Sequence, residues 1–206
     1  MILYIIAMHD EAKDIIEKFQ IIQETPFSLY QYNNQLLVIS GIGKVNASLA
    51  LSSVLTKYKV SQIINIGFAG ANGNYQLGDK IMIESASYHD FDLTIFGYKK
   101  GQVPSYPAIF KSTLTLNCQY PKAHLYTGDY FMTEKLNNNY LVDMEGAALY
   151  QVAYKYNVPI ISYKIVSDII GVKNHKEEYE NFEKNGSLYV KQIYDKINKE
   201  AKWKKD

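Results

Sequence analysis

The sequence of 206 residues contains no arginine, and all 22 of its basic residues are lysine. Arginine binds phosphate and carboxylate groups through two parallel hydrogen bonds, whereas lysine offers only a point charge. The composition therefore excludes any mechanism that needs guanidinium groups.

The sequence has one cysteine, Cys118, and four histidines, at positions 9, 89, 124 and 175. A single cysteine cannot form a disulfide within the chain, which agrees with a reducing compartment. The histidines do not have the spacing of a metal-binding motif, and the cysteine has no second thiol beside it. We therefore expect no structural or catalytic metal and no cofactor.

The sequence also lacks a large excess of charge and a long apolar run. Its net charge of +1 gives no reason to expect a nucleic-acid or membrane partner. The first apolar run, residues 1–7, is too short to span a bilayer and has no basic segment before it, so we expect a buried first strand. With 47% hydrophobic and 21% charged residues, the composition is typical of a soluble globular protein. We expect a cytoplasmic protein whose residues 1–206 form a single domain.

Apolar runs of strand length alternate with helical patterns along the chain. We expect strands over residues 2–7, 27–32, 35–40, 61–67, 79–86, 123–127, 139–143 and 159–166. We expect helices over residues 10–20, 44–57, 145–156 and 177–199. The runs 61–67 and 159–166 are continuously apolar, which indicates strands that are covered on both faces. The sequence therefore predicts an α/β protein with three layers, α/β/α, around a central mixed sheet.

Polar or glycine-rich segments follow six of the expected strands. They contain Glu11, Gly41–Gly43, Gly67–Gly70, Gly128–Asp129, Glu145 and Asp168. Ligands of open α/β sheets bind beyond the carboxyl ends of the strands. We therefore expect these segments to meet at one pocket.

The glycines at 41 and 43 raise the question of a dinucleotide site. The third glycine of that fingerprint is replaced by Asn46, and no acidic residue follows at the distance needed to hold a ribose. A tight turn that lets a small ligand approach the backbone fits the segment better, although such turns also serve only to pack a helix on a strand.

Three carboxylates are candidates for proton transfer. Glu11, Glu145 and Asp168 each follow an apolar strand, where burial would raise the pKa of a carboxyl group. Each of them, taken alone, is more often a helix cap or half of a surface ion pair. Only their convergence on one pocket would favour catalysis.

The run from Tyr88 to Tyr98 combines aromatic residues with two aspartates and glycine. Glycine and aspartate favour a loop. A loop that presents Phe96 and Tyr98 needs an apolar partner, which is either a ligand or another subunit.

Taken together, these motifs resemble those of the 5'-methylthioadenosine/S-adenosylhomocysteine nucleosidases of the nucleoside phosphorylase superfamily. The resemblance extends from the first strand to the last helix. It rests on Ala7–Glu11, Ser40–Ala47, Asn65–Gly70, Tyr88–Tyr98, Gly101–Pro104, Gly128–Phe131, Asp143–Ala147 and Val166–Asp168. It implies a nucleoside phosphorylase-like fold and hydrolysis of the N-glycosidic bond, which releases adenine and a 5-thio-substituted ribose.

The resemblance also implies roles for individual residues. Glu11 corresponds to the carboxylate that activates the attacking water, and Asp168 to the acid that protonates the purine at N7. Ser167 corresponds to a residue of the adenine pocket. Phe131 corresponds to the aromatic residue that stacks on the base, with main-chain groups near Met132 at the base edge.

The remaining roles concern the sugar and its 5' substituent. Glu145 corresponds to the acceptor for the ribose hydroxyls, and Met144 packs beside the sugar. The resemblance implies a homodimer in which Ile42 of one subunit, with Phe96 and Pro104 of the other, lines the pocket for the alkylthio group.

Two residues of the expected substrate pocket depart from the family. Phe68 stands where the family usually has a small hydroxyl residue, and Lys164 where it usually has an arginine. Both family residues help to hold the attacking water. Two alternatives therefore stay open: a phosphorylase that uses phosphate in place of water, and a nucleoside-binding relative without catalysis.

Overall fold

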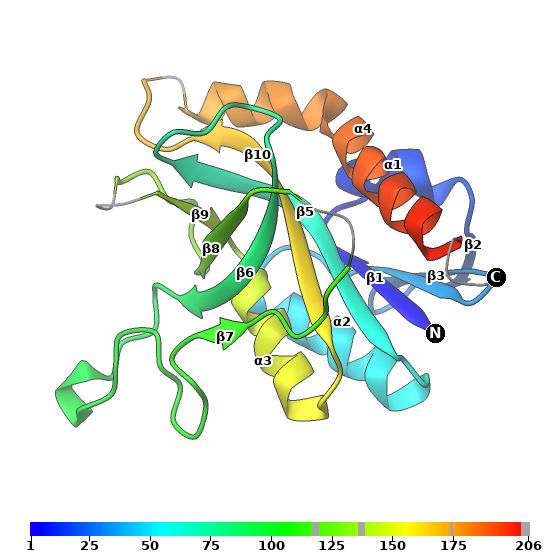
Figure 1. Ribbon diagram of the computed structural model, residues 1–206, viewed down its shortest axis with the longest axis horizontal. Helices are drawn as coiled ribbons and strands as arrows, with labels where there is room; N and C mark the ends of the chain where they lie inside the picture. The colour runs from blue at the N-terminus through cyan, green and yellow to red at the C-terminus, as the bar shows by residue number, and fades with distance from the viewer. Residues whose placement is uncertain (117–119, 136–138, 174, 203–206) are drawn as a thin grey trace.

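The computed structural model describes residues 1–116, 120–135, 139–173 and 175–202. Cys118 lies outside the described residues, as does the end of the chain from residue 203. The described part forms one mixed sheet with helices on both of its faces (Figure 1).

The sheet contains ten strands among the described residues. They are β1 (Ile2–Ile6), β2 (Gln20–Gln23), β3 (Ser28–Tyr32), β4 (Gln35–Ile39), β5 (Gln62–Asn72), β6 (Lys80–Tyr88), β7 (Phe110–Lys111), β8 (Lys122–Thr127), β9 (Tyr140–Asp143) and β10 (Ile160–Ile169). They pair in the order β10-β6-β8-β9-β5-β1-β4-β3-β2, and β7 pairs with β6.

Part of this sheet is closed on itself. β10 pairs with β6 on one side and with β5 on the other, so β5, β10, β6, β8 and β9 form a ring. β5 can take part in both halves of the sheet because it is long: it pairs with β1 up to Asn65 and with β9 from Gly70 onward. Between these two stretches, this edge of β5 has no neighbouring strand in the described part of the chain.

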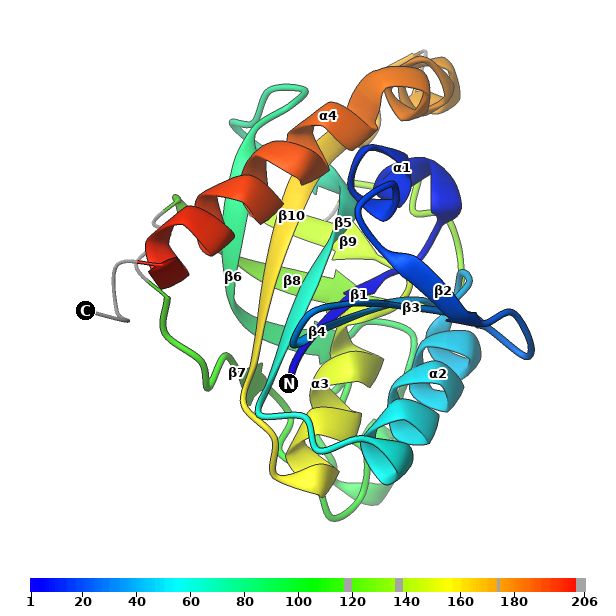
Figure 2. The ribbon, with the colours of Figure 1, turned by 90° about the vertical axis from the view of Figure 1, so that its right-hand side faces the viewer.

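In the described part of the chain, four α-helices cover the sheet in two pairs (Figure 2). α2 (Lys44–Lys57) and α3 (Gly146–Tyr156) contribute to one buried apolar cluster, which contains Leu51, Ala147 and Leu149. α1 (His9–Ile16) and α4 (His175–Lys202) contribute to a second cluster, on the opposite face. This arrangement confirms the three-layer α/β/α prediction. None of the described helices has the length and apolarity that crossing a membrane requires.

The expected strands and helices are present, with three differences. The helix expected over residues 10–20 ends at Ile16, and Gln20, the last residue of that range, begins strand β2, which was not predicted. β7 was not predicted, since two residues are too few for a periodic pattern. β5 and β10 each extend further than expected, so Gly67, Gly70 and Asp168 lie within strands and not after them.

Candidate active site

The candidate site is a pocket on the side of the ring where β5 passes between β1 and β9. About 610 Å³ of space lies between the protein atoms here, part of it open to solvent. Nine residues singled out from the sequence line it: Glu11, Ile42, Phe68, Phe131, Met132, Met144, Glu145, Ser167 and Asp168. The structure therefore brings together residues that are up to 157 positions apart in the sequence.

The convergence does not follow the geometry expected from the sequence. β5 and β9 are antiparallel, so their carboxyl ends point in opposite directions. Asp143 reaches the pocket from the end of β9, whereas Phe68 and Asp168 reach it from within β5 and β10. The pocket therefore forms where side chains from within β5 and β10 meet side chains at the ends of other elements, and not because six strand ends share one edge.

Glu11 is the third residue of α1 and is almost fully buried. One carboxylate oxygen accepts a hydrogen bond from the amide of Phe68 at 2.7 Å, and the other accepts one from Met8 at 3.1 Å. Phe68 lies where one edge of β5 has no neighbouring strand, so the carboxylate satisfies a buried amide that the sheet leaves unpaired. Burial raises the pKa of Glu11, and the charge of Lys164 and these amides oppose the rise.

Gly67 leaves the space that this carboxylate needs. A Cβ at position 67 would lie 3.0 Å from Oε1 of Glu11 and 3.4 Å from Nζ of Lys164. A side chain at this position would therefore crowd the carboxylate of Glu11, while Lys164 would be at an ordinary contact distance.

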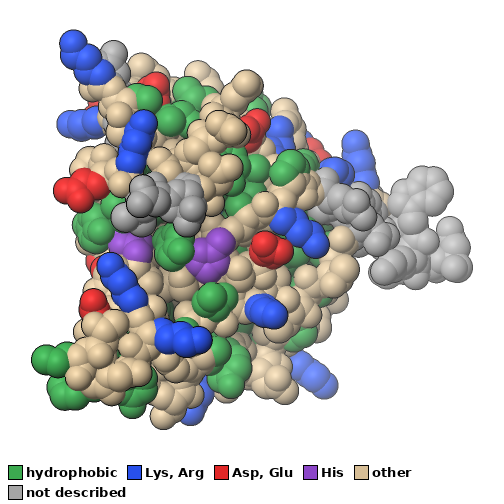
Figure 3. Space-filling view, turned by 60° about the vertical axis from the view of Figure 1, so that its left-hand side comes forward, with side chains coloured by type: hydrophobic (Ala, Val, Ile, Leu, Met, Phe, Trp, Pro, Cys, Tyr) green, Lys and Arg blue, Asp and Glu red, His purple; other side chains and the backbone are tan. Residues whose placement is uncertain are grey.

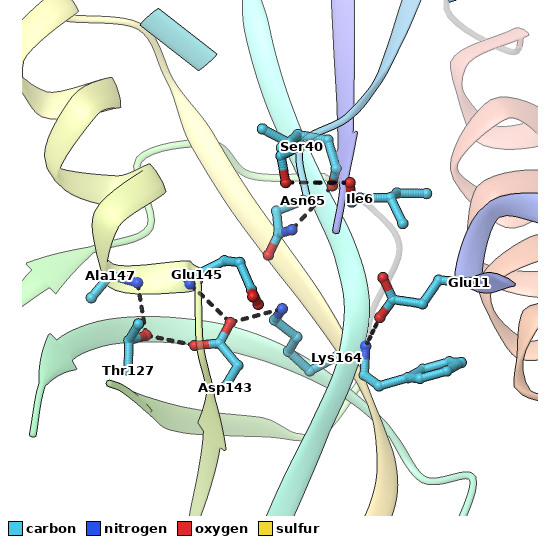
Figure 4. A network of polar contacts seen from close by, with 12 residues as sticks. Ile6, Glu11, Ser40, Asn65, Thr127, Asp143, Glu145, Ala147 and Lys164 are labelled. Atoms are coloured by element: carbon cyan, nitrogen blue, oxygen red, sulfur yellow. Dashed lines mark hydrogen bonds and ion pairs between the residues drawn. The ribbon is translucent and has the colours of Figure 1, made fainter. Parts of the chain in front are cut away.

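Lys164 lies behind the pocket wall and forms a buried ion pair with Asp143, at 2.9 Å between Nζ and Oδ2 (Figure 4). Asp143 also accepts hydrogen bonds from Thr127 at 2.6 Å and from the amide of Gly146 at 2.9 Å. Burial lowers the pKa of Lys164, but Asp143, Glu145 and Glu11 together raise this pKa by more than burial lowers it. The amine is therefore charged. One ammonium group thus faces three carboxyl groups.

Glu145 precedes α3 and is buried beside this ion pair. Its Oε1 accepts a hydrogen bond of 2.8 Å from the amide of Gly43, in the glycine turn before α2. Burial and the negative charge of Asp143 raise the pKa of Glu145 to about 8, against the opposing charge of Lys164. The glycine turn thus orients Glu145 through its backbone amide.

Asp168 is placed by an irregularity in the pairing of β10 with β5. Val166 is opposite Ala69 and Asp168 is opposite Gly70, so Ser167 is an extra residue. Such a β-bulge redirects the side chains next to it. The hydroxyl of Ser167 donates a hydrogen bond to Asp168 at 2.5 Å. Gly70 makes room for the carboxylate, because a Cβ there would lie 2.7 Å from its Oδ2.

The outer part of the pocket is aromatic. Phe131 is half-exposed, and its ring centre lies 5.8 Å from that of Tyr179 in α4. Tyr130, Met132 and Ile170 complete this side. A flat apolar ligand would fit between these rings and the carboxylates below them.

Sequence reasoning gave no role to several of the lining residues, among them Asp143, Tyr179 and Ile170. Asp143 stands in a motif that was recognised, and its place next to Glu145 was the available signal. Tyr179 and Ile170 gave no signal, because an aromatic residue in an amphipathic helix and an apolar residue after a strand are both typical of a core.

Phe96 and Pro104 do not line the pocket of their own chain. Phe96 is 73% exposed in the short helix η1 (Thr94–Phe96), at the tip of the loop after β6. The base of this loop is fixed, since Asp90 accepts hydrogen bonds from Lys44 Nζ at 2.5 Å and from the amide of Asp129 at 2.9 Å. Figure 3 shows a group of hydrophobic side chains next to lysines, at the lower left of the face that is drawn. The loop after β6 lies at the same height in Figure 1.

No cluster of three or more potential metal ligands was found among the described residues. Those residues that line the pocket offer hydrogen-bonding and proton-transfer groups and an apolar wall.

The partly closed mixed sheet thus carries a pocket that is lined by four buried carboxyl groups, those of Glu11, Asp143, Glu145 and Asp168. The family model of the phosphorylase superfamily matches residues 1–198. The chain belongs to this superfamily.

Within it, the chain is similar to 5'-methylthioadenosine/S-adenosylhomocysteine nucleosidases. It is 34% identical to the one from Bacillus cytotoxicus, over 81% of each protein. A solved structure of the nucleosidase from Neisseria meningitidis, in complex with methylthio-immucillin-A, has a TM-score of 0.87 and 25% identity, and the match covers 96% of this chain and 98% of that one. The one from Colwellia psychrerythraea, in complex with adenine, has a TM-score of 0.85 and 26% identity, with 94% and 92% covered. The resemblance inferred from the motifs is confirmed.

Proposed function

We propose that this protein hydrolyses the N-glycosidic bond of 5'-methylthioadenosine and S-adenosylhomocysteine, releasing adenine and a 5-thio-substituted ribose. The observation that carries the proposal is the meeting of Glu11, Glu145 and Asp168, all buried, in one pocket. The names of the similar proteins point to the same reaction.

The reaction breaks the bond between C1' of the ribose and N9 of adenine, and water supplies the new bond at C1'. Positive charge develops on the sugar and negative charge on the leaving base. Glu11 accepts the proton of the attacking water, and its raised pKa suits a general base. Asp168 supplies the proton that adenine takes up at N7, and Ser167 fixes the orientation of its carboxyl group.

The other pocket residues bind the substrate. Glu145 accepts hydrogen bonds from the ribose hydroxyls, with Met144 beside the sugar. Phe131 stacks on adenine, and main-chain groups near Met132 contact its edge. Ile42 contacts the alkylthio group from the glycine turn. The aromatic and apolar character of this wall supports these assignments.

The two departures from the family act in different ways. Lys164 keeps the positive charge of the arginine, but it is paired with Asp143, so it acts on Glu11 through its field. Phe68 brings no hydroxyl group, and its backbone amide donates a hydrogen bond to Glu11. The attacking water is therefore held mainly by Glu11.

An adenine-release assay tests the proposal against its alternatives. Purified protein should release adenine from 5'-methylthioadenosine in phosphate-free buffer. Release that requires phosphate would identify a phosphorylase. Binding without release would identify a non-catalytic nucleoside-binding protein.

Two isosteric variants test the assigned roles. Glu11→Gln and Asp168→Asn should each fold normally and lose most turnover, since a general acid or base contributes ~10²–10⁴-fold. Their circular dichroism spectra and melting temperatures serve as the control. Adenine release at the wild-type rate by either variant would refute the role of that residue.

The proposal extends to the assembly and setting of the protein. We propose a homodimer in which Phe96 and Pro104 of one subunit line the alkylthio pocket of the other. The exposed ring of Phe96 supports this arrangement. The proposed substrates place the reaction in methionine salvage, and the expected setting is the cytoplasm, without nucleic-acid or membrane partners.

A further inference from the structure

The first turns of α4 form one wall of the pocket. Tyr179 lines the pocket, with its hydroxyl 3.8 Å from the sulfur of Met8 and its ring 5.8 Å from that of Phe131. The shape of the pocket therefore depends on where this end of α4 lies against the sheet (Figure 2).

The ring of Phe68 packs against α4 at Gly186, where only a glycine leaves space for it. The ring packs edge-on against Phe182, with 5.3 Å between the ring centres. A Cβ at Gly186 would lie 2.4 Å from Cζ of Phe68 and 2.8 Å from Cε1 of Phe182. The ring thus sits directly against the backbone of the helix, one to two turns beyond Tyr179.

The backbone of Phe68 contacts Glu11 on the opposite wall of the pocket. The amide of Phe68 donates the 2.7 Å hydrogen bond to Glu11. Other contacts of this part of α4 lead to α1: Ser187 donates to Asp14, and Lys13 donates to the carbonyl of Lys184 at 2.8 Å. Phe68 instead joins α4 to β5, the strand whose amide holds Glu11.

We propose that Phe68 is a positioning residue, whose ring sets α4 at the distance from β5 at which Tyr179 completes the substrate pocket. Phe68, which stands where the family usually has a small hydroxyl residue, then has a different role from that residue. It contributes no hydroxyl group to the water site, and it fixes the wall of the binding site instead. The kinetic consequences of this inference rest on the proposed function, but its structural consequence does not.

Phe68→Ala separates positioning from chemistry, because alanine keeps the backbone amide that Glu11 needs. Without the ring, the first turns of α4 are no longer held at their distance from β5, and substrate binding weakens. KM for 5'-methylthioadenosine should rise about tenfold while kcat changes by less than about threefold, the pattern of lost binding. Backbone amides of residues 176–184 should exchange hydrogen faster than in the wild type.

Ile193→Ala is the control for damage to the apolar cluster. Ile193 is fully buried on α4 in the same apolar cluster as Phe68, but it does not line the pocket. Its loss should lower stability and leave KM unchanged. A rise in KM equal to that of Phe68→Ala would mean that any damage to this cluster weakens binding, and it would overturn the proposal.

Changes on both sides of the contact give a stricter test. Phe68→Leu keeps part of the apolar bulk and should recover part of the lost affinity. Gly186→Ala pushes the helix off the ring and should raise KM by itself. In the double variant Phe68→Ala/Gly186→Ala the added methyl group enters the space that the ring leaves, so the combined loss should be smaller than the sum of the single losses.

Hydrogen exchange decides the case independently of catalysis. Wild-type exchange over residues 176–184 in Phe68→Ala would overturn the proposal, as would faster exchange with an unchanged KM. If the wild type released no adenine, the proposed function would fail. The positioning role would then be judged by the exchange rates and by the affinity for adenine measured by calorimetry, which should fall in Phe68→Ala.

Discussion

The carboxyl group of Glu145 holds its proton more tightly in the folded protein than in the unfolded chain. Its pKa rises from the usual 4.5 to about 8, because it is buried beside Asp143. The unfolded chain therefore releases this proton at a lower pH than the folded protein does. It follows that Glu145 stabilises the fold fully below about pH 4.5, and that this contribution is lost as the pH rises through 8.

We predict that Glu145→Gln reduces the pH dependence of the free energy of unfolding. Urea unfolding at pH 5, 6.5 and 8 should show the free energy of unfolding falling with pH in the wild type, and falling less in the variant. A folded-state pKa only one unit above the unfolded value already corresponds to about 1.4 kcal/mol. Equal slopes in the two proteins would contradict the prediction.

Between β9 and β10, the ion pair of Lys164 with Asp143 links two strands of the ring. We predict that Lys164→Met lowers the free energy of unfolding by about 3–5 kcal/mol, since it leaves buried carboxyl groups without their counter-charge. Urea unfolding measures the effect. Lys191→Met is the control: Lys191 pairs with Asp195 on the partly exposed side of α4, where an ion pair is worth about 1 kcal/mol or less. Similar losses in both variants would contradict the assigned importance of burial.

The bulge in β10 works only because β5 has a glycine opposite it. We predict that Gly70→Ala displaces the carboxylate of Asp168, since the new Cβ would lie 2.7 Å from Oδ2. Turnover should fall about 10²-fold, which is the cost typical of a 1 Å misplacement in an active site. Melting temperature and adenine release together test this: a folded variant with normal turnover would show that the bulge does not fix the position of the acid.

At the level of elements, the sequence predicted where strands and helices lie better than how they meet. Strands such as β4 and β9 are short apolar runs with clear ends, so their positions could be read from hydrophobicity. The glycines of β5 suggested a loop, because nothing in the local sequence reveals that distant carboxylates occupy the space of their missing side chains. The closure of the ring depends on the pairing of β10 with β5, which is a contact between residues far apart in the chain.

In the candidate site, too, some residues could be predicted from the local sequence and others could not. Glu11, Glu145 and Asp168 could be found because acidic residues next to apolar strands are unusual, and the motifs around them are specific. The partner of Lys164 could not be found, since three carboxyl groups lie near it and only the fold selects Asp143. Tyr179 was missed because its place on the pocket side of α4 depends on how the helix packs.

For the whole molecule, the open question is what covers Phe96. We predict that Phe96→Ala raises KM for 5'-methylthioadenosine several-fold, while KM for adenosine, which lacks the thioether, changes less; burying a large apolar side chain is worth about 1.5–3 kcal/mol. Sedimentation of the wild-type protein should show a dimer. A monomeric wild type, or equal effects on both substrates, would contradict a shared pocket.

The closed ring also has a consequence for synthesis on the ribosome. β5 is complete when residue 72 has been added, but β10, which pairs with both β5 and β6, begins only at Ile160. Until then the growing chain presents an uncovered, largely apolar strand edge, the kind of surface that pairs with other chains. β10, the last of the described strands to emerge, is thus the one that closes the ring, so premature termination before residue 160 would leave nascent protein that needs a chaperone to stay unaggregated.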